Sequence, residues 1–268
     1  MLKGFSTPLS PAGRSSLAPM PPWHYAGTGL VIDTRTDADA VAAVLPPGLE
    51  PDKDDPGRSV AHFFDWQACT DGGAELVDPS RSQYREFFVL VAARLDGQPV
   101  MYCPYIIVDQ DISLMRGLIQ GLPKQIGSVW MTRAQEVEGV AAPQVGPGGR
   151  FGATLAMKER RLAEATVTLR ETADKAPGLT GGLPVVGMRY FPELTRDLRD
   201  RPPVHELVRF AASDRRLSQV WRGDATLSLF PSPIHELADL APREILGGYR
   251  YAMSMSVDDL VKLKDLRG

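Results

Sequence analysis

The feature that most constrains the fold is a succession of strand-like segments with no long helical pattern between them. Residues 59–68, 85–95 and 99–108 are rich in aromatic and β-branched side chains, which is typical of strands. The tetrapeptide LDGQ (95–98) joins the last two, and its Asp-Gly pair favours the positive φ angles of a hairpin turn. Strands that are neighbours in sequence favour an antiparallel α+β or barrel-like architecture over a doubly wound one.

The second half of the chain continues this pattern. Residues 150–172 predict more strand, with a helix as an alternative for the middle of the segment. Residues 249–263 predict a last strand followed by a short terminal helix. Three further segments also have strand composition: 183–194, 205–214 and 225–230.

Helices are expected to be few, because the sequence holds 23 prolines and 25 glycines. The clearest one begins within residues 36–48, where Thr36 or Asp37 can cap the N-terminus and two prolines end the pattern. The Pro-rich segment 10–23 is expected to be extended. Since there is neither an internal repeat nor a long linker, we expect a single domain over residues 1–268.

Composition excludes several classes of function. The hydrophobic fraction of 43% supports a sizeable core, and the formal net charge of −3 gives no electrostatic case for nucleic acid or a membrane surface. No apolar run approaches the roughly 20 residues that span a bilayer. The N-terminus lacks the apolar segment of a signal peptide, so we expect a cytoplasmic protein.

Cysteines and histidines give no sign of a metal site. Cys69 and Cys103 are isolated, which predicts buried thiols in a reducing compartment. The histidines have no paired spacing; they are His24, His62, His205 and His235. We therefore expect no metal and no cofactor.

One lysine stands in an apolar, glycine-rich segment, RGLIQGLPKQIGSVW (116–130). Lys124 is either a solvated turn residue or a buried amine. Burial without a partner disfavours the charged form and lowers the pKa of a lysine. A neutral amine is the nucleophile that forms a Schiff base with a ketone or 2-oxo acid.

This segment resembles the lysine segment of the acetoacetate decarboxylase superfamily, which usually reads as a Tyr-Pro-Lys-Lys-Leu-Gly-like run. The resemblance extends over nearly the whole chain, through residues 33–50, YREFF (84–88), WRGDATLSLF (221–230) and LADLAPREI (237–245). It implies a curled antiparallel sheet, cone-like, with peripheral helices and the lysine inside. It also implies a homo-oligomer.

The resemblance assigns roles to individual residues. Lys124 falls on the Schiff-base lysine, and Glu86 falls on the glutamate used near the reacting carbon. The second lysine of the family motif is Gln125 here, and the N-terminal arginine of the family aligns near Gly27. These two differences place the family's namesake decarboxylation in doubt and leave imine chemistry in place.

Arg116, Gln120 and Lys124 recur every four residues, so on a helical turn they would share one side. Arginine is the natural bidentate partner of a carboxylate, and Gln120 can add a hydrogen bond. The pattern is similar to that of superfamily members that bind pyruvate as a Schiff base and catalyse aldol condensation with dehydration. The alternative for Arg116 is a surface ion pair with Asp109 or Asp111.

Tyrosines are further candidates for the site. Tyr84 lies two residues from Glu86, so in a strand both side chains point to one face, where a phenol can donate a proton or orient an aldehyde oxygen. Tyr249 and Tyr251 have the same spacing, and Tyr251 is a candidate substrate-binding residue. Core packing is the alternative for each tyrosine.

We therefore expect a lyase that condenses a 2-oxo acid such as pyruvate with an aldehyde through an enamine on Lys124. Two alternatives are open. The first is decarboxylation of a β-keto acid through the same imine. The second is a non-catalytic module that binds a small molecule.

Overall fold

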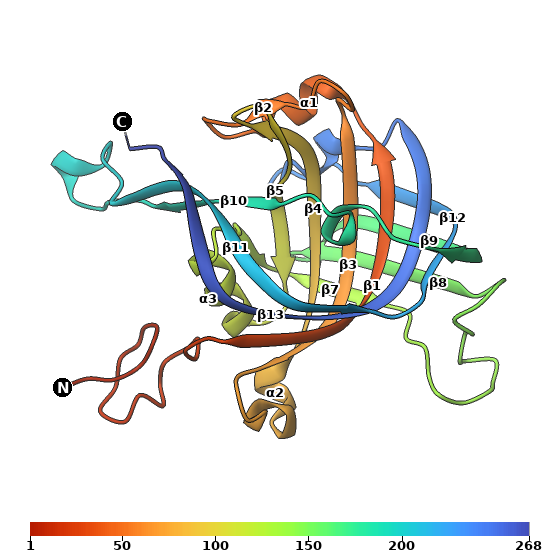
Figure 1. Ribbon diagram of the computed structural model, residues 1–268, viewed down its shortest axis with the longest axis horizontal. Coiled ribbons are helices and arrows are strands. Elements are labelled where there is room, and N and C mark those ends of the chain that lie inside the picture. Colours follow the sequence, from red (N-terminus) through yellow and green to blue (C-terminus); the bar gives the residue numbers. More distant parts are fainter. Residues whose placement is uncertain (268) are drawn as a thin grey trace.

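A computed structural model describes residues 1–267 of the chain. Within this range thirteen strands form one continuous sheet that curls on itself (Figure 1). The strands are β1 (Trp23–Arg35), β2 (Glu50–Pro51), β3 (Arg58–Cys69), β4 (Gln83–Leu95), β5 (Gln98–Val108), β6 (Lys124–Ile126), β7 (Ser128–Met131), β8 (Arg150–Met157), β9 (Arg160–Ala173), β10 (Val185–Phe191), β11 (Val204–Leu217), β12 (Val220–Leu229) and β13 (Glu244–Asp265).

Seven of these strands close into a ring in the order β1-β3-β4-β5-β10-β11-β13, because β13 pairs back onto β1. All neighbours in the ring are antiparallel except β5 and β10. β12, β9, β8 and β7 continue the sheet outward from β13. The predicted α+β fold with a curled, mostly antiparallel sheet is confirmed.

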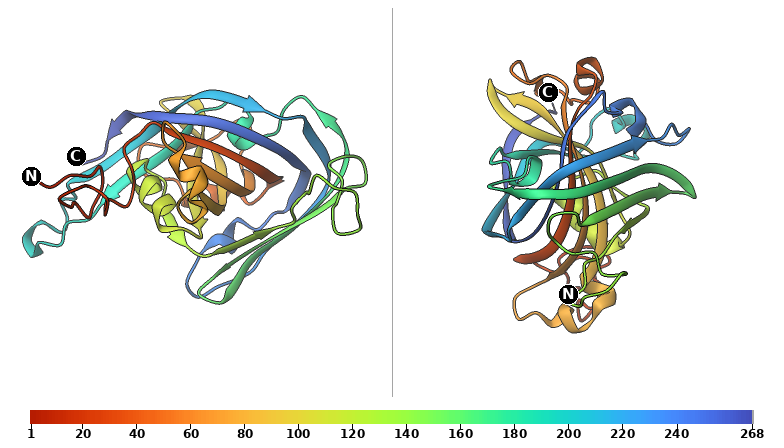
Figure 2. Two further views of the ribbon diagram at one scale, coloured as in Figure 1. Left: turned by 90° about the horizontal axis from the view of Figure 1, so that it is seen from below. Right: turned by 90° about the vertical axis from the view of Figure 1, so that its right-hand side faces the viewer.

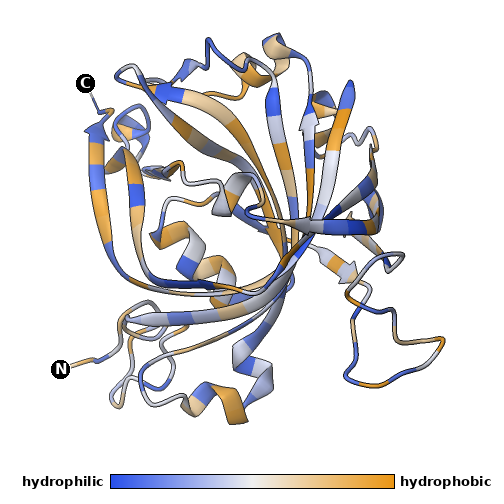
Figure 3. Ribbon diagram, turned by 45° about the vertical axis from the view of Figure 1, so that its right-hand side comes forward, coloured by the Kyte–Doolittle hydropathy of each residue, from blue (hydrophilic) through white to orange (hydrophobic). Residues whose placement is uncertain are grey.

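The wall formed by β1, β3, β4 and β5 is buried on both faces. One face packs against β7, β8 and β9 through a core that includes Leu30, Phe63 and Phe87. The other face points into the ring and carries a second core that includes Phe64 and Phe88. Strands buried on both faces read as continuous apolar runs, which accounts for the sequence FFVLVAA in β4. Hydrophobic residues accordingly recur along these strands (Figure 3).

Three α-helices accompany the sheet within residues 1–267: α1 (Ala38–Ala43), α2 (Pro79–Ser82) and α3 (Asp111–Ile119). α1 begins as predicted, with the Asp37 side chain accepting a hydrogen bond from the Asp39 amide. α3 contacts β5 and β6 and lies within the curve of the sheet (Figure 2). None of these helices is long and apolar enough to cross a membrane.

The predicted hairpin at 95–98 is confirmed: Asp96 and Gly97 have φ angles of 49° and 78° between β4 and β5. Two helix expectations are wrong. A two-residue turn at Lys158 and Glu159 joins β8 to β9 where a helix was the alternative. The expected terminal helix is the end of β13, which pairs with β11 to Asp265. β1 was not predicted as a strand.

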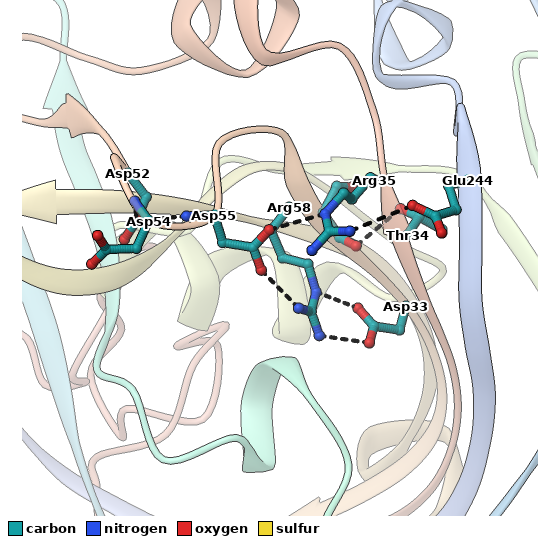
Figure 4. Close-up of polar contacts among 9 residues, drawn as sticks. Asp33, Thr34, Arg35, Asp52, Asp54, Asp55, Arg58 and Glu244 are labelled. Atoms are coloured by element: carbon teal, nitrogen blue, oxygen red, sulfur yellow. Dashed lines mark hydrogen bonds and ion pairs between the residues drawn. The ribbon is translucent and has the colours of Figure 1, made fainter.

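A network of charged side chains ties β1, β3 and β13 together at the end of the sheet near α1 (Figure 4). Arg58 donates from Nε and Nη2 to the two carboxylate oxygens of Asp33, both at 2.6 Å, and from Nη1 to Asp55 at 2.8 Å. Arg35 extends the network from Asp55 to Glu244. The Asp33 side chain is buried, so its pairing offsets a large desolvation cost.

Candidate active site

Lys124 opens onto a small cavity inside the ring of strands. The cavity has a volume of about 50 Å³, far below the roughly 300 Å³ at which pockets for drug-sized ligands begin. Apolar side chains make up most of the wall. The lining residues are Tyr25, Trp66, Tyr84, Glu86, Phe88, Leu90, Cys103, Ile106, Gln120, Leu122, Lys124, Leu179, Val185, Phe210 and Met255.

The Lys124 amine is buried and has two polar neighbours. Residue exposure is 9%, and Nζ lies 2.6 Å from Oε2 of Glu86. Nζ also donates a hydrogen bond to Oγ of Ser113, at 2.9 Å. Lys124 begins β6, which pairs in parallel with β5, while Ser113 lies on α3 and Glu86 on β4. Three separate elements therefore hold this amine.

The alkyl chain of Lys124 rests on the backbone of Gly117 in α3. A Cβ atom at Gly117 would lie 2.3 to 2.5 Å from three methylene carbons of Lys124. No side chain fits at this position unless the lysine moves. The glycine therefore provides the space through which Lys124 reaches the cavity.

Burial lowers the pKa of Lys124 below its ordinary value, and the charge of Arg116 lowers it further. The carboxylate of Glu86 opposes both effects by stabilising the ammonium form. Desolvation is the largest of these influences. The fraction of neutral amine is consequently larger than for a lysine in water.

Tyr84 and Glu86 point to the same face of β4, as predicted, and both line the cavity. Both Tyr84 and Glu86 are buried, so neither side chain faces solvent. Burial raises the pKa of Tyr84 well above its ordinary value, and the neighbouring Glu86 adds to this increase. Tyr84 is a neutral phenol over the physiological pH range.

Arg116 is 3% exposed, so the alternative of a surface ion pair is wrong. Asp109 pairs instead with Arg85, at 2.8 Å. The Arg116 guanidinium stands over the rings of Tyr25 and Tyr84, 5.2 and 5.6 Å from their centroids. Within residues 1–267, its Nε and Nη2 are buried and have no hydrogen-bond partner. The arginine contacts two rings of the cavity wall and is not itself a lining residue.

Gln120 lines the cavity directly. It is the C-cap residue of α3, whereas Lys124 lies beyond the helix on β6, so the shared helical side holds for Arg116 and Gln120 but not for Lys124. Gly121, with a φ of 78°, ends the helix and turns the chain back. The lysine thus returns over the helix that precedes it.

Tyr251 is buried behind the aromatic wall. Its ring lies edge-on to Phe64, 5.9 Å between centroids, and Phe64 stacks on the cavity residue Trp66 at 4.3 Å. Tyr251 is not among the residues that line the cavity. Its hydroxyl is buried and without a partner in the described range, and burial raises the pKa of Tyr251. Its role as a substrate-binding residue stays a prediction.

Gln125 and Gly27 occupy the positions at which the resemblance to the family predicts a second lysine and an N-terminal arginine. Gln125 is exposed and follows Lys124 on β6, so its side chain does not neighbour the amine. The nearby cation is Arg116, from α3. At Gly27 a Cβ would lie 2.4 Å from the ring of Trp66, so this indole occupies the space a side chain would need.

Several site residues were missed from the sequence. Ser113 and Gly117 lie one helical turn apart on α3, and Gln120 follows three residues later. This spacing could have indicated that the three residues share one side of the helix. Tyr25 comes from the unpredicted strand β1. Cys103 lines the cavity as a neutral thiol, since burial raises its pKa.

The ring of strands encloses a buried lysine beside a small cavity. The family model "Acetoacetate decarboxylase (ADC)" matches residues 6–266. The chain belongs to the acetoacetate decarboxylase family and is a lyase.

Known proteins with a similar sequence or structure agree with this assignment. The enduracididine biosynthesis enzyme MppR, solved with the condensation product of pyruvate and imidazole 4-carboxaldehyde, is 37% identical, with a TM-score of 0.91 over 99% of this chain and 98% of that one. MppR complexed with pyruvate superposes with a TM-score of 0.89, over 99% of each chain. An acetoacetate decarboxylase of Acidiphilium cryptum (strain JF-5) is 25% identical over 257 residues, which cover 95% of this chain and 92% of the relative.

Proposed function

We propose that this chain forms a Schiff base between Lys124 and a 2-oxo acid such as pyruvate, and condenses it with an aldehyde with loss of water. The observation that carries the proposal is the Lys124 amine, desolvated in a small apolar cavity with one carboxylate at 2.6 Å. The likeness to MppR, which was solved with pyruvate and with a pyruvate–aldehyde condensation product, supports this substrate class.

The reaction begins with attack of the neutral amine on the ketone carbon. Loss of water gives an iminium ion, which draws electrons from the neighbouring carbon. Glu86 then removes a proton from the methyl group and leaves an enamine. The enamine carbon bonds to the aldehyde carbon, and the new alkoxide takes a proton from Glu86 or Tyr84. Elimination of that hydroxyl as water and hydrolysis of the imine release an unsaturated 2-oxo acid and the free lysine.

Charge balance favours an anionic substrate. Arg116 and Glu86 compensate each other when Lys124 is neutral. Formation of the iminium adds one positive charge to a desolvated site, and a substrate carboxylate neutralises it. Gln120 lines the cavity, and its side-chain amide can donate a hydrogen bond to a substrate oxygen. We assign the carboxylate to Gln120, and Arg116 supplies positive charge from behind the rings of Tyr25 and Tyr84, with its buried Nε and Nη2 unpartnered in the described range.

Decarboxylation of a β-keto acid is the second candidate, and the family match and the relative from Acidiphilium favour it. It uses the same imine, and loss of carbon dioxide replaces removal of the methyl proton. Because Gln125 points to solvent, the missing second lysine does not decide between the two reactions.

Borohydride trapping separates the two reactions. The protein is incubated with pyruvate or acetoacetate, reduced, and examined by intact mass and peptide mapping. We expect a pyruvate adduct on Lys124, no adduct in Lys124→Ala, and a normal adduct in Lys158→Ala, which removes an exposed lysine. Rapid release of carbon dioxide from acetoacetate without a pyruvate adduct would overturn the proposal in favour of decarboxylation.

A non-catalytic binding module predicts a different result. It gives no reducible adduct with either acid, and Lys124→Ala keeps the affinity for the ligand. Turnover of pyruvate with an aromatic aldehyde, followed by the ultraviolet absorbance of the conjugated product, completes the test. Loss of both the adduct and this absorbance in Lys124→Ala would exclude the binding module.

A further inference from the structure

A second and larger cavity lies outside the mechanism described above. Its volume is about 650 Å³, within the range of about 300–1,000 Å³ that is usual for small-molecule sites. The paired strands β1, β3 and β13 form one side of it, with Gln83 at the start of β4. Residues 131–135, at and after the end of β7, and residues 216–218, at and after the end of β11, form the rest.

Arg250 of β13 lines this cavity and is 5% exposed. Its guanidinium stacks on the ring of Phe151, 4.0 Å from the centroid. Nε is buried without a hydrogen-bond partner in the described part of the chain, and no carboxylate in residues 1–267 forms an ion pair with Arg250. A buried guanidinium with no counter-charge is costly, and burial lowers the pKa of Arg250 to about 10.

The rest of the lining fits an anion. Arg133 and Arg216 add positive charge, while Asp65 is the one acidic lining residue and already pairs with Arg133 at 3.1 Å. Hydroxyl and amide side chains complete the wall: Thr28, Gln67, Gln83, Thr132, Gln135, Ser218 and Ser254. A planar guanidinium flanked by such donors matches the oxygens of a carboxylate or phosphate.

This cavity is distinct from the one at Lys124. Arg250 and Tyr251 are successive residues of β13, so they point to opposite faces of the sheet. Tyr251 packs in the core inside the ring, whereas Arg250 stacks on Phe151 in the outer core. Trp66 is the residue that lines both cavities.

We propose that this second cavity binds a small molecule through a carboxylate or phosphate group, with the Arg250 guanidinium as its principal partner. Ligand binding supplies the counter-charge that the chain does not provide to Arg250. The two oxyanion types share the same chemistry here, and separate probes distinguish them.

Isothermal titration calorimetry with inorganic phosphate and with succinate tests the proposal. We expect the wild-type protein to bind at least one probe, and Arg250→Met to weaken that binding at least about 10-fold, as loss of a charged hydrogen bond does. Arg209→Met is the matched control, because it removes an exposed arginine of β11 outside both cavities. Lys124→Ala should bind as tightly as wild type, which also separates this test from the fate of the proposed function.

If Arg250→Met does not fold, Arg250→Lys is measured in its place. Lysine retains the positive charge but lacks the planar guanidinium group that donates two parallel hydrogen bonds. It should weaken binding several-fold, with circular dichroism and thermal unfolding as checks on the fold. Binding of phosphate but not of succinate would indicate a ligand with a phosphate group. Binding of succinate but not of phosphate would indicate a ligand with a carboxylate group. Absence of binding to both probes, or unchanged affinity in both variants, would overturn the proposal. Altered oligomeric size in Arg250→Met without altered affinity would also overturn it and assign the cavity to a second copy of the chain.

Discussion

Three methylene carbons of Lys124 lie where a side chain on Gly117 would begin, at 2.3 to 2.5 Å from the position of its Cβ. The lysine cannot reach Glu86 along this path unless residue 117 is glycine. Gly117 is therefore a positioning residue for the amine, although it carries no functional group.

Gly117→Ala tests this relationship. We expect the rate of adduct formation with pyruvate to fall at least ~100-fold, because a displacement of about 1 Å at a reacting group has this effect. The higher helix propensity of alanine should raise the free energy of unfolding by about 1 kcal/mol, and over-packing should lower it by about 1–3 kcal/mol. The net loss is small, so the variant should still fold. Time-resolved borohydride trapping and urea unfolding measure the two effects.

Gly139→Ala is the control, since a Cβ there meets nothing within 4 Å. It should leave the trapping rate unchanged. Full activity in Gly117→Ala would show that Lys124 reaches the cavity by another route.

The pH dependence of adduct formation should report the lowered pKa of Lys124. The neutral amine accumulates as pH rises through that pKa, so the rate should rise with a midpoint below 10.5. Glu86 raises the pKa of Lys124 and Arg116 lowers it. The midpoint should therefore move to lower pH in Glu86→Gln and to higher pH in Arg116→Met. Borohydride trapping at set times over a series of pH values measures the rates and hence the midpoints.

Arg209→Met should leave the midpoint in place, because this arginine is exposed on β11. Shifts of the same sign in Glu86→Gln and Arg116→Met would contradict the electrostatic origin of the lowered pKa.

Glu86→Gln should separate imine formation from proton transfer. The amine stays in place, so the trapped adduct with pyruvate still forms. Exchange of the pyruvate methyl protons in D₂O should fall by about 10²–10⁴-fold, the usual contribution of a general base. Proton NMR follows the exchange. Equal exchange rates in the variant and wild type would assign the base to another residue, with Tyr84→Phe as the next variant to measure.

Arg58→Met should destabilise the fold through Asp33. Removing one partner of a buried ion pair costs about 3–5 kcal/mol, and the partial exposure of Arg58 reduces the expected loss to about 2–3 kcal/mol. Urea unfolding at pH 7 measures this, with Arg209→Met expected within about 0.5 kcal/mol of wild type.

The effect of Arg58→Met should depend on pH with a defined sign. Burial raises the pKa of Asp33 in the folded protein. Its titration therefore contributes to the free energy of unfolding below the unfolded pKa of 3.8, and this contribution is lost as pH rises through the folded pKa. Loss of Arg58 raises that pKa further. The destabilisation should therefore be larger at pH 7 than at pH 4, and an equal loss at both would exclude Asp33 as its source.

Much of the fold was readable from local pattern, and the failures have physical causes. β4 and β5 were predicted because Asp96-Gly97 supplies the required turn. The turn at Lys158 and Glu159 has two positive φ angles without glycine or asparagine, so it left no signal. Residues near Val261 have helix-compatible composition, but pairing with Arg209 of β11 decides their conformation.

The candidate site was partly predictable for the same reason. The apolar surroundings of Lys124 indicated burial, and the spacing of Tyr84 and Glu86 on β4 indicated a shared face. The contact of Lys124 with Gly117 depends on how the chain turns back after α3. Tyr25 enters from β1, which pairs on one side with β3 and on the other with β13, more than 200 residues away in the sequence. Such contacts between distant segments leave no local pattern.

Because β1 and β13 close the ring, the ring can form only after β13 has been synthesised. Trp23 pairs with Val257, so one edge of β1 cannot form its backbone hydrogen bonds until residue 257 has left the ribosome. At about 5–20 residues per second the wait is roughly 10–50 s. Throughout that interval β1 presents an edge of unpaired backbone N–H and C=O groups, which is a template for aggregation. We therefore expect the free edge of β1 to be the aggregation-prone part of the nascent chain until β13 pairs with it.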